Sequence, residues 1–238
     1  MNLVNKTVLI TGANGGVGKA LVRYCIEHGA QKIYCCAREI EKLDDLKMMS
    51  ERVEVCRIDI TDKGEIAQLA SVVNTIDILI NNAGVNSQKR VFDEGTSDFD
   101  VNVQGTLNVC RGLRHSIAKG GAIINITSIV ALVNLPIMGL YSASKSALHS
   151  LTQAMRAELS PHRIEVYEVL PGPIDTDMTK GQEMEKNAPE DIVAALFKGY
   201  EEKNYEIYPD PFSKGIKEAL ENDCKALELN FASSVQSL

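Results

Sequence analysis

The chain opens with a short apolar run, a glycine-rich turn and a helical pattern, and this order limits the possible folds more than any other stretch. Residues 6–10 (KTVLI) form the apolar run, residues 11–18 (TGANGGVG) the turn, and residues 17–28 the helical pattern. Such a turn lets the backbone approach a pyrophosphate closely, and the helix N-terminus offers unpaired N–H groups. We therefore expect a dinucleotide-binding unit, although glycines also form turns that bind no ligand. Its predicted contacts are Gly12, Asn14, Gly16, Val17 and Gly18.

Residues 32–37 (KIYCCA) are predicted to form the second strand, and Arg38 follows it. In dinucleotide folds this point, about 20 residues past the glycines, faces the adenosine ribose. An acidic residue there binds the 2′-hydroxyl of NAD, whereas an arginine accommodates the 2′-phosphate of NADP. Neither Ala37 nor Arg38 is acidic, so the sequence favours NADP(H) and leaves NAD(H) possible. The alternative is an arginine that begins a solvated helix and pairs with Glu39 or Glu41.

Polar and small residues follow the third and fourth predicted strands, at residues 53–58 and 76–80. In an open parallel sheet, ligands lie beyond the carboxyl ends of the strands. The candidate contacts at these two ends are Asp59, Ile60, Asn81, Ala83 and Gly84. Asp59 is expected either to accept a hydrogen bond from adenine or to cap the helix that begins near Asp62. Asn81 has the alternative of bonding to neighbouring backbone and stiffening the sheet.

Tyr141 and Lys145 lie four residues apart at the start of a helical pattern that ends near Ser160. A phenol and an ammonium therefore share one face of a helix. A free tyrosine titrates near 10, and lowering its pKa to about 7 requires roughly 4 kcal/mol of differential stabilisation of the phenolate. A cation one turn away, helped by a second cationic ring, can supply it. Tyr-x-x-x-Lys also occurs by chance, so it is the nucleotide-binding pattern upstream that indicates a function for this pair.

The rest of the chain continues to alternate between strands and helices, with no hairpin signals. The further predicted elements are helices at residues 97–118, 141–160, 189–201 and 213–229, and strands at residues 122–126, 165–170 and 205–209. This order predicts a Rossmann-type α/β fold, a doubly wound, mostly parallel seven-stranded sheet with helices on both faces. No linker composition interrupts the 238 residues. We expect one dinucleotide-binding domain over residues 1–238, with substrate-site and C-terminal elements from about residue 173 onward.

Charge and cysteine usage exclude several classes of partner. A net charge of −7 and a pI near 5.2 argue against a nucleic-acid or anionic-membrane surface. The six cysteines form no C-x-x-C pair, so we expect reduced thiols, with no metal site and no disulfide. The first residues lead directly into a strand, and no apolar run reaches membrane length. The prediction is a cytoplasmic protein without nucleic-acid or membrane partners.

Six motifs of this chain occur in a recognisable order and approximate spacing. They are Thr11-Gly12-x3-Gly16-Val17-Gly18, Asn81-Asn82-Ala83-Gly84, Asn102, Ser128, Tyr141-x3-Lys145 and Pro171-Gly172-Pro173-Ile174-x-Thr176. In this order they resemble the short-chain dehydrogenase/reductase family, over residues 3 to about 210. Residues 210–238 match no pattern of that family.

The resemblance implies an oxidoreductase that interconverts a small-molecule carbonyl and an alcohol by hydride transfer. Tyr141 would be the general acid or base, Lys145 would hold the nicotinamide ribose and lower the pKa of Tyr141, and Ser128 would bond the substrate oxygen. Asn102 would hold a water that links Lys145 to solvent. Further cofactor contacts implied by the motifs are Gly12, Gly16, Val17, Gly18, Asn81, Ala83, Gly84, Pro171, Gly172, Ile174 and Thr176. Related proteins commonly form dimers or tetramers through two long helices, so a homodimer or homotetramer is expected.

Two departures from the family pattern affect the expected specificity. Gly15 stands where many NADP-using relatives carry a second basic residue, so Arg38 would discriminate alone and the preference for NADP is expected to be moderate. Residues 175–188, which form a lid in relatives, are polar, with Met178 and Met184 as their only large apolar residues. This composition predicts an open site.

Two other functions use the same nucleotide unit. A catalytically idle NADP(H)-binding sensor or scaffold would need neither the phenol of Tyr141 nor the hydroxyl of Ser128. A sugar-nucleotide epimerase or dehydratase usually needs a larger C-terminal domain, for which 238 residues leave little room. The apolar residues 129–140 suit an apolar ketone or aldehyde, but core or subunit contact is the favoured interpretation. The sequence does not identify the substrate.

Overall fold

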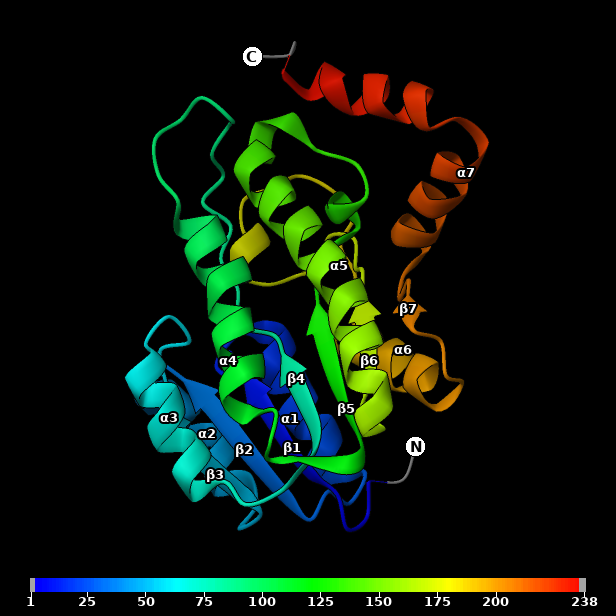
Figure 1. Ribbon diagram of the computed structural model, residues 1–238. Helices are drawn as coiled ribbons and strands as arrows, with labels where there is room; N and C mark the ends of the chain where they lie inside the picture. Colours follow the sequence, from blue (N-terminus) through cyan, green and yellow to red (C-terminus); the bar gives the residue numbers. More distant parts are fainter. Residues whose placement is uncertain (1–2, 236–238) are drawn as a thin grey trace.

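The computed structural model describes residues 3–235 and is built on one seven-stranded sheet (Figure 1). Its strands are β1 Thr7–Thr11, β2 Lys32–Ala37, β3 Val53–Arg57, β4 Ile76–Asn81, β5 Ile117–Ile126, β6 Glu165–Val169 and β7 Glu206–Ile207. The strand order is β3-β2-β1-β4-β5-β6-β7, and every pair is parallel. The order reverses between β1 and β4, which is where ligands bind in such sheets. The predicted Rossmann-type fold is confirmed.

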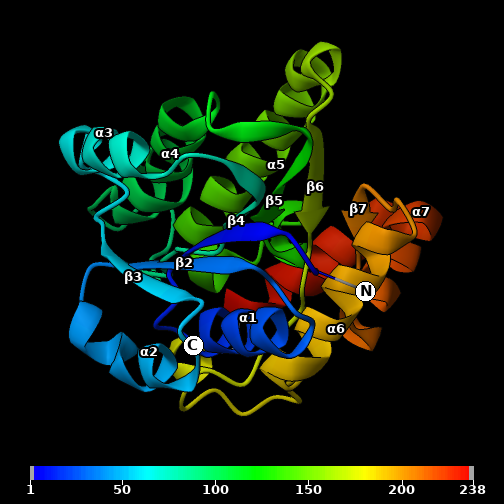
Figure 2. The same cartoon turned by 90° about the horizontal axis from the view of Figure 1, so that it is seen from below.

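Helices cover both faces of the sheet, as Figure 2 shows from below. On one face lie α1 Gly16–Glu27, α2 Asp44–Met49 and α6 Pro189–Glu201. On the other lie α3 Lys63–Val72, α4 Thr106–Leu113 and α5 Gly139–Leu159. The last helix, α7 Pro211–Ala232, rises beside β7 and then bends over the top of the molecule in Figure 1.

Each face of the sheet has its own apolar core, because successive side chains of a strand point in opposite directions. In β1, Val8 and Ile10 pack into the cluster beneath α1 and α6, whereas Leu9 packs into the cluster beneath α3 and α4. All three are completely buried. Burying such a side chain contributes about 1.5–3 kcal/mol, and burial on both faces explains why the strands are continuous apolar runs.

The helix predicted over residues 97–118 is wrong at its carboxyl end. The observed helix stops with α4, and β5 begins at Ile117, which pairs with Ile76 of β4. The register then shifts, so residues 118–121 bulge out of the strand, and Gly120 adopts a φ of 85°. The glycine pair therefore bends a strand and does not end a helix.

The glycine turn after β1 is held by close backbone contacts. Gly12 has a φ of 64°, and a Cβ atom there would lie 2.7 Å from the Cα of Ala83. Inside α1, a Cβ atom on Gly18 would lie 2.2 Å from the carbonyl oxygen of Gly12 and 2.7 Å from the Cα of Ala13. These backbone atoms cannot move without opening the turn, so both positions require glycine.

We predict that Gly18→Ala lowers the free energy of unfolding by about 2–3 kcal/mol, because the added methyl group overpacks rigid backbone. Gly215→Ala is the matched control, since this helical glycine of α7 has nothing within 4 Å of the added atom. It should raise the free energy of unfolding by about 0.5–1 kcal/mol through helix propensity. Urea unfolding followed by circular dichroism measures both, and equal effects of the two changes would contradict the packing described for the turn.

Candidate active site

Two adjoining cavities lie at the carboxyl ends of the strands. The larger, of about 630 Å³, lies beyond β1, β4, β5 and β6. The smaller, of about 100 Å³, lies beyond β1, β2 and β3. Gly12, Asn14, Ala83 and Gly84 line both. Together the cavities occupy the crevice at the point where the strand order reverses, as expected for a dinucleotide.

Two side chains clamp the glycine turn to the loop after β4. The hydroxyl oxygen of Thr11 accepts hydrogen bonds from the N–H groups of Asn82 and Ala83, each at 3.1 Å. The amide of Asn82 donates to the carbonyl oxygens of Thr11, at 3.1 Å, and Gly12, at 2.9 Å. The sequence motifs contain Thr11 and Asn82, but we predicted no role for either. These hydrogen bonds hold the backbone of Gly12 and Ala83 at the floor of the larger cavity.

The start of α1 fits a pyrophosphate. Its N-cap residue, Gly15, makes no side-chain hydrogen bond, and no acidic residue occupies the first turn. The first N–H groups of the helix therefore have no capping side chain and remain able to bind an anion. A Cβ atom on Gly16 would lie 2.7 Å from Cγ2 of Thr176, so this glycine lets α1 approach the loop after β6. The predicted contacts Val17 and Gly18 also line the larger cavity.

The smaller cavity brings together Arg38, Asp59 and Ile60. Burial raises the pKa of Asp59, but hydrogen bonds from Thr61 and the nearby charge of Arg38 lower it more, so the net shift is downward. Asp59 accepts from the N–H of Thr61 at 2.9 Å, forming a local turn. Asp62 is the residue that caps α3. The alternative in which Asp59 caps that helix is therefore wrong.

Asn81, a predicted cofactor contact, lies outside both cavities. Its side chain is 3% exposed, and its amide donates to Oδ1 of Asn125 at 2.8 Å and to Sγ of Cys110 at 3.2 Å. Asn125 in turn donates to the hydroxyl of Thr152 on α5 at 2.9 Å. The Asn81 side chain thus ties β4 to β5. The alternative left open by the sequence had it stiffen the sheet through bonds to backbone, whereas its partners are side chains.

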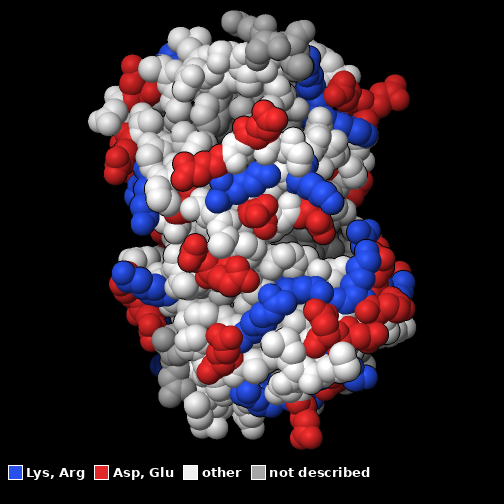
Figure 3. Space-filling model, turned by 180° about the vertical axis from the view of Figure 1, so that it is seen from behind, with Lys and Arg blue, Asp and Glu red and all other residues white. Residues whose placement is uncertain are grey.

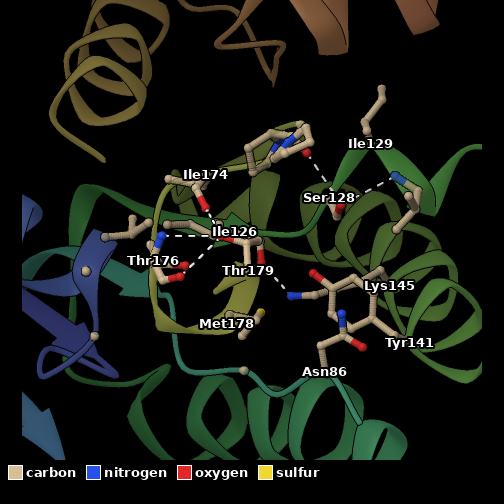
Figure 4. A pocket seen from close by; sticks show the side chains of 18 of the residues that line it. Asn86, Ile126, Ser128, Ile129, Tyr141, Lys145, Ile174, Thr176, Met178 and Thr179 are labelled. Carbon is tan, nitrogen blue, oxygen red and sulfur yellow. Dashed lines mark hydrogen bonds between the residues drawn. The ribbon is translucent and has the colours of Figure 1, made fainter. Parts of the chain in front are cut away.

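The catalytic candidates Tyr141 and Lys145 project from one face of α5 into the larger cavity (Figure 4). The Lys145 ammonium lies 5.7 Å from the centre of the Tyr141 ring and donates to the carbonyl oxygen of Ile126 at 3.0 Å. Ser128 also lines the cavity, and its hydroxyl donates to the carbonyl oxygen of Pro171 at 3.4 Å. Figure 4 shows the loop after β6, with Thr176, across the cavity from this group.

Serine hydroxyls fix the start of α5. Ser142 accepts from the N–H of Leu135 and donates to the carbonyl oxygen of Met138, each at 3.2 Å. Ser146 donates to the carbonyl oxygen of Ala131 at 2.7 Å. These bonds join α5, which carries Tyr141, to the segment that begins at Ser128. The side chains of Tyr141 and Ser128 therefore keep a fixed separation.

Burial shifts the pKa values of Tyr141 and Lys145 in opposite directions. For Tyr141, burial raises the pKa to about 12, and a hydrogen bond with Ser128 offsets this in part. For Lys145, which is 5% exposed, burial lowers the pKa to about 8, while the charges of Glu168 and Asp98 act in the opposite direction. In the ligand-free protein at neutral pH, the phenol is therefore protonated and the ammonium charged.

Glu168 is a functional candidate that the sequence analysis missed. It lies in β6, is completely buried, and accepts a hydrogen bond from the Thr127 hydroxyl at 2.7 Å. Its other oxygen lies 2.8 Å from Nδ1 of His149, two turns along α5 from Tyr141. Burial raises the pKa of Glu168, and the hydrogen bonds to these two residues oppose this shift. A glutamate inside an apolar strand was the available signal, since such residues are rarely buried without a partner.

Asn102 lies beside the cavity but does not line it. It sits in a π-helix, Phe99–Gly105, and is completely buried. Its side chain accepts from the N–H of Val85 at 2.8 Å and donates to the Val85 carbonyl oxygen at 2.9 Å and to Ser144 of α5 at 3.0 Å. A Cβ atom on Gly84 would lie 3.1 Å from Oδ1 of Asn102 and 3.5 Å from Nζ of Lys145. Asn102 therefore holds the loop after β4 against the catalytic helix.

The far wall of the larger cavity comes from the loop after β6 and from α7. Pro171, Gly172 and Ile174 line it, as predicted. The loop is pinned at its neck, where Asn187 donates to Pro173 at 3.0 Å and accepts from Asp175 at 2.9 Å. Four large apolar side chains complete this wall, namely Met178 and Met184 of the loop and Phe212 and Phe231 of α7. The prediction of an open site rested on the loop alone and did not include α7, which reaches the cavity and adds two aromatic side chains to its wall.

Among residues 3–235, no group of three or more histidine, cysteine, aspartate or glutamate side chains is placed to hold a metal ion. Within the same range, no helix combines the length and apolar character needed to cross a membrane. On the face seen in Figure 3, positive and negative side chains are interspersed.

Comparisons with known proteins agree with this geometry. A family model described as short chain dehydrogenase matches residues 6–187. An uncharacterised oxidoreductase of Staphylococcus aureus (strain USA300) is 31% identical over 209 residues, 82% of this chain and 90% of that protein. A 3-oxoacyl-[acyl-carrier-protein] reductase of Chlamydia muridarum is 31% identical over 194 residues, 75% and 78% of the two chains. The crystal structure of a short chain dehydrogenase from Burkholderia cenocepacia in complex with NADP has a TM-score of 0.90 and 38% identity, covering 97% of this chain and 99% of that one.

The lowered pKa of Lys145 predicts a specific dependence of stability on pH. Between its native pKa of about 8 and its ordinary value of 10.5, the unfolded chain binds more protons at this residue than the folded chain. Lys145 therefore adds stability as the pH rises through this window, and the gain is lost as the pH falls through the native pKa. Compared with Lys145→Met, the wild type should gain about 2–3 kcal/mol of unfolding free energy from pH 7 to about pH 10.

Denaturant unfolding at several pH values measures this difference. Lys119→Met, at an exposed lysine, is the matched control for the general effect of losing one positive charge. A difference between wild type and Lys145→Met that stays constant over this range would show that burial does not shift the titration of the Lys145 ammonium.

Proposed function

The chain belongs to the short-chain dehydrogenase family of oxidoreductases, and we propose that it interconverts a carbonyl and an alcohol with NADP(H). One observation supports this most. The phenol of Tyr141, the ammonium of Lys145 and the hydroxyl of Ser128 line the same cavity as the glycine turn and the start of α1. A nucleotide site and a proton donor thus share one crevice, which is what hydride transfer to a carbonyl requires.

The residues of the chain divide the work of the reaction. The nicotinamide cofactor supplies the hydride. Tyr141 is protonated in the ligand-free protein and so can give its proton to the carbonyl oxygen. Ser128 bonds the same oxygen and stabilises the negative charge that develops on it. In the reverse direction, the Tyr141 phenolate accepts the proton of the alcohol.

Lys145 and Asn102 serve this proton transfer in different ways. The Lys145 ammonium is close to the phenol ring and stabilises the phenolate that remains after the proton is given up. It would also hold the nicotinamide ribose when the cofactor binds. The Asn102 side chain makes three hydrogen bonds, two with Val85 and one with Ser144, and so supports the family's proton relay by fixing the loop and α5 around Lys145. A water that links Lys145 to solvent completes the relay.

We assign the preference for NADP to Arg38. Among the described residues that line the smaller cavity, Arg38 is the sole cation. A guanidinium binds a phosphate through two parallel charge-assisted hydrogen bonds. The similar protein of Burkholderia cenocepacia was solved with NADP, which supports the same choice here. Because Gly15 adds no second cation, the preference is moderate and NAD(H) remains a usable cofactor.

We also propose one domain over residues 1–238, a homodimer or homotetramer formed through α4 and α5, and a cytoplasmic location. Both helices lie on the same outer face in Figure 1, which leaves them free to pair with a second copy. All six cysteines are free thiols, and four of them are buried, which suits a reducing compartment.

Replacing Tyr141 by Phe removes the proton donor and keeps the ring. We predict that kcat for carbonyl reduction falls about 10²–10⁴-fold, while the Kd for NADPH stays within about twofold. Tyr205→Phe, at a phenol far along the chain and outside both cavities, is the matched control and should keep full activity. Steady-state assays by NADPH absorbance and fluorescence titration of the cofactor supply the two readings. Retained turnover in Tyr141→Phe would remove Tyr141 from the acid role.

Arg38→Asp places a carboxylate where the 2′-phosphate is proposed to bind. The ratio of kcat/KM for NADPH to that for NADH should fall about 10- to 100-fold, the usual value of a charged hydrogen bond. Lys42→Asp introduces the same charge change at an exposed position that lines neither cavity. If both variants change the ratio equally, the effect is one of general charge, and Arg38 does not contact the phosphate.

A further inference from the structure

The C-terminal helix α7 is two helices joined at a bend. Asp223 has a φ of −155° and a ψ of 88°, which no helical residue adopts. Its side chain accepts a hydrogen bond from the N–H of Ala226 at 2.9 Å and so begins a new helix, in the way that an N-cap residue does. After the bend, the second half of α7 turns back over the top of the molecule (Figure 1).

Both ends of α7 are fastened beside the cavity. At its start, Asp210 is 2% exposed and accepts hydrogen bonds from the N–H groups of Gly172 and Ser213, each at 2.8 Å. A Cβ atom on Gly172 would lie 2.8 Å from the Phe212 ring, so that ring sits directly on the loop after β6. Beyond the other end of α7, residues 233–235 contact the short turn Pro136–Met138, which leads into α5. The helix therefore spans the cavity from the cofactor loop to the catalytic helix.

Large apolar side chains from three separate segments meet in the cavity under this span. They are Leu135 and Met138 before α5, Met178 and Met184 of the loop after β6, and Phe212 and Phe231 of α7. Three of them expose a large part of their surface: Met178 is 40% exposed, and Met184 and Phe212 are each 46% exposed. A ligand that covers apolar surface at a concave site binds more tightly, because removing that surface from water is favourable. Methionines adapt to ligands of different shape, which suits a binding site. We call the space between these six apolar side chains the chamber.

The side-chain charges of the larger cavity disfavour an anion outside the start of α1, where backbone N–H groups can bind a pyrophosphate. Among the described residues that line the larger cavity, Lys145 is the one cation, and its ammonium is buried and bonded to the carbonyl oxygen of Ile126. Two lining residues, Asp177 and Glu185, are acidic. A substrate carboxylate or phosphate would lose its hydration and meet two carboxylates without gaining a partner.

We propose that the substrate is an uncharged carbonyl compound with a bulky apolar group, and that α7, through Phe231, forms the wall that holds this group. The identification of a carbonyl rests on the proposed function. The proposal also explains why residues 129–140 are apolar. Four residues of this segment line the cavity, namely Ile129, Val130, Leu135 and Met138. Ile129 and Val130 are also buried, at 1% and 8% exposure, so this segment serves the core and the chamber together.

Three ketones test the proposal in the full-length protein: acetone, 2-nonanone and 8-oxononanoate, which is 2-nonanone with a terminal carboxylate. We expect kcat/KM for 2-nonanone to exceed that for acetone at least about 100-fold, and that for 8-oxononanoate at least about tenfold. The same order should appear in the dissociation constants of the ketones for the complex of protein and NADP⁺, measured by calorimetry. Equal values for the three compounds would overturn the proposal.

Variants then locate the wall. Phe231→Ala should lower kcat/KM for 2-nonanone about tenfold or more and weaken its binding equally, while values for acetone and the Kd for NADPH stay unchanged. Met184→Ala, on an exposed side chain of another segment, should act in the same direction. Leu229→Ala is the matched control, because this residue lies two positions away in α7, is 62% exposed and does not line the cavity.

The binding readings separate the two proposals. If 2-nonanone binds in preference to 8-oxononanoate but no ketone is reduced, the reaction is wrong and the chamber stands. If acetone and 2-nonanone are reduced equally well, and Phe231→Ala behaves like Leu229→Ala, the reaction stands and the chamber is wrong.

Discussion

The buried ammonium of Lys145 is the interaction on which the rest of the site depends. Removing a charge from water is costly, and burial lowers the pKa of Lys145 to about 8. The chain offsets this cost with the carbonyl oxygen of Ile126, at 3.0 Å, and with the negative charges of Glu168 and Asp98. The proposed stabilisation of the Tyr141 phenolate requires that this ammonium stay charged at neutral pH.

This requirement explains why polar residues cross an otherwise apolar sheet. Asn81 pairs in register with Asn125, Asn125 with Glu168, and Glu168 with Glu206. The row lies close to the carboxyl ends of four neighbouring strands, and the charge of its Glu168 acts on Lys145. Hydrogen bonds among Asn81, Asn125 and the residues of α5 satisfy much of this row, so its burial adds rigidity where position matters. Polar residues thus replace part of the apolar core, and the charge of Glu168 among them helps to keep Lys145 protonated.

Local patterns in the sequence were enough to predict the fold and the helix that carries Tyr141 and Lys145. The glycine turn, the strand runs buried on both faces and the four-residue spacing of Tyr141 and Lys145 all act over short distances along the chain, where periodicity is informative. Long-range effects were not predictable in the same way. Ile117 looks like the end of a helix until its pairing with Ile76 is known. Likewise, Glu168 is recognised as a paired buried carboxylate only when its contact with His149, across the helix–sheet interface, is known. The position of Phe231 depends on a bend at Asp223 that no apolar pattern marks.

The central claim is that the surroundings of the phenol, its burial together with nearby charge, set its proton affinity. Tyrosines labelled with ¹³C at Cζ report this by NMR titration, with Tyr141→Phe identifying the signal among the seven tyrosines. In the ligand-free protein the Tyr141 signal should titrate near the pKa of about 12 that burial sets. Saturating NADP⁺ adds a second cation beside the ring and should lower this pKa by at least about 2 units. A Tyr141 pKa that is the same with and without NADP⁺ would contradict the account.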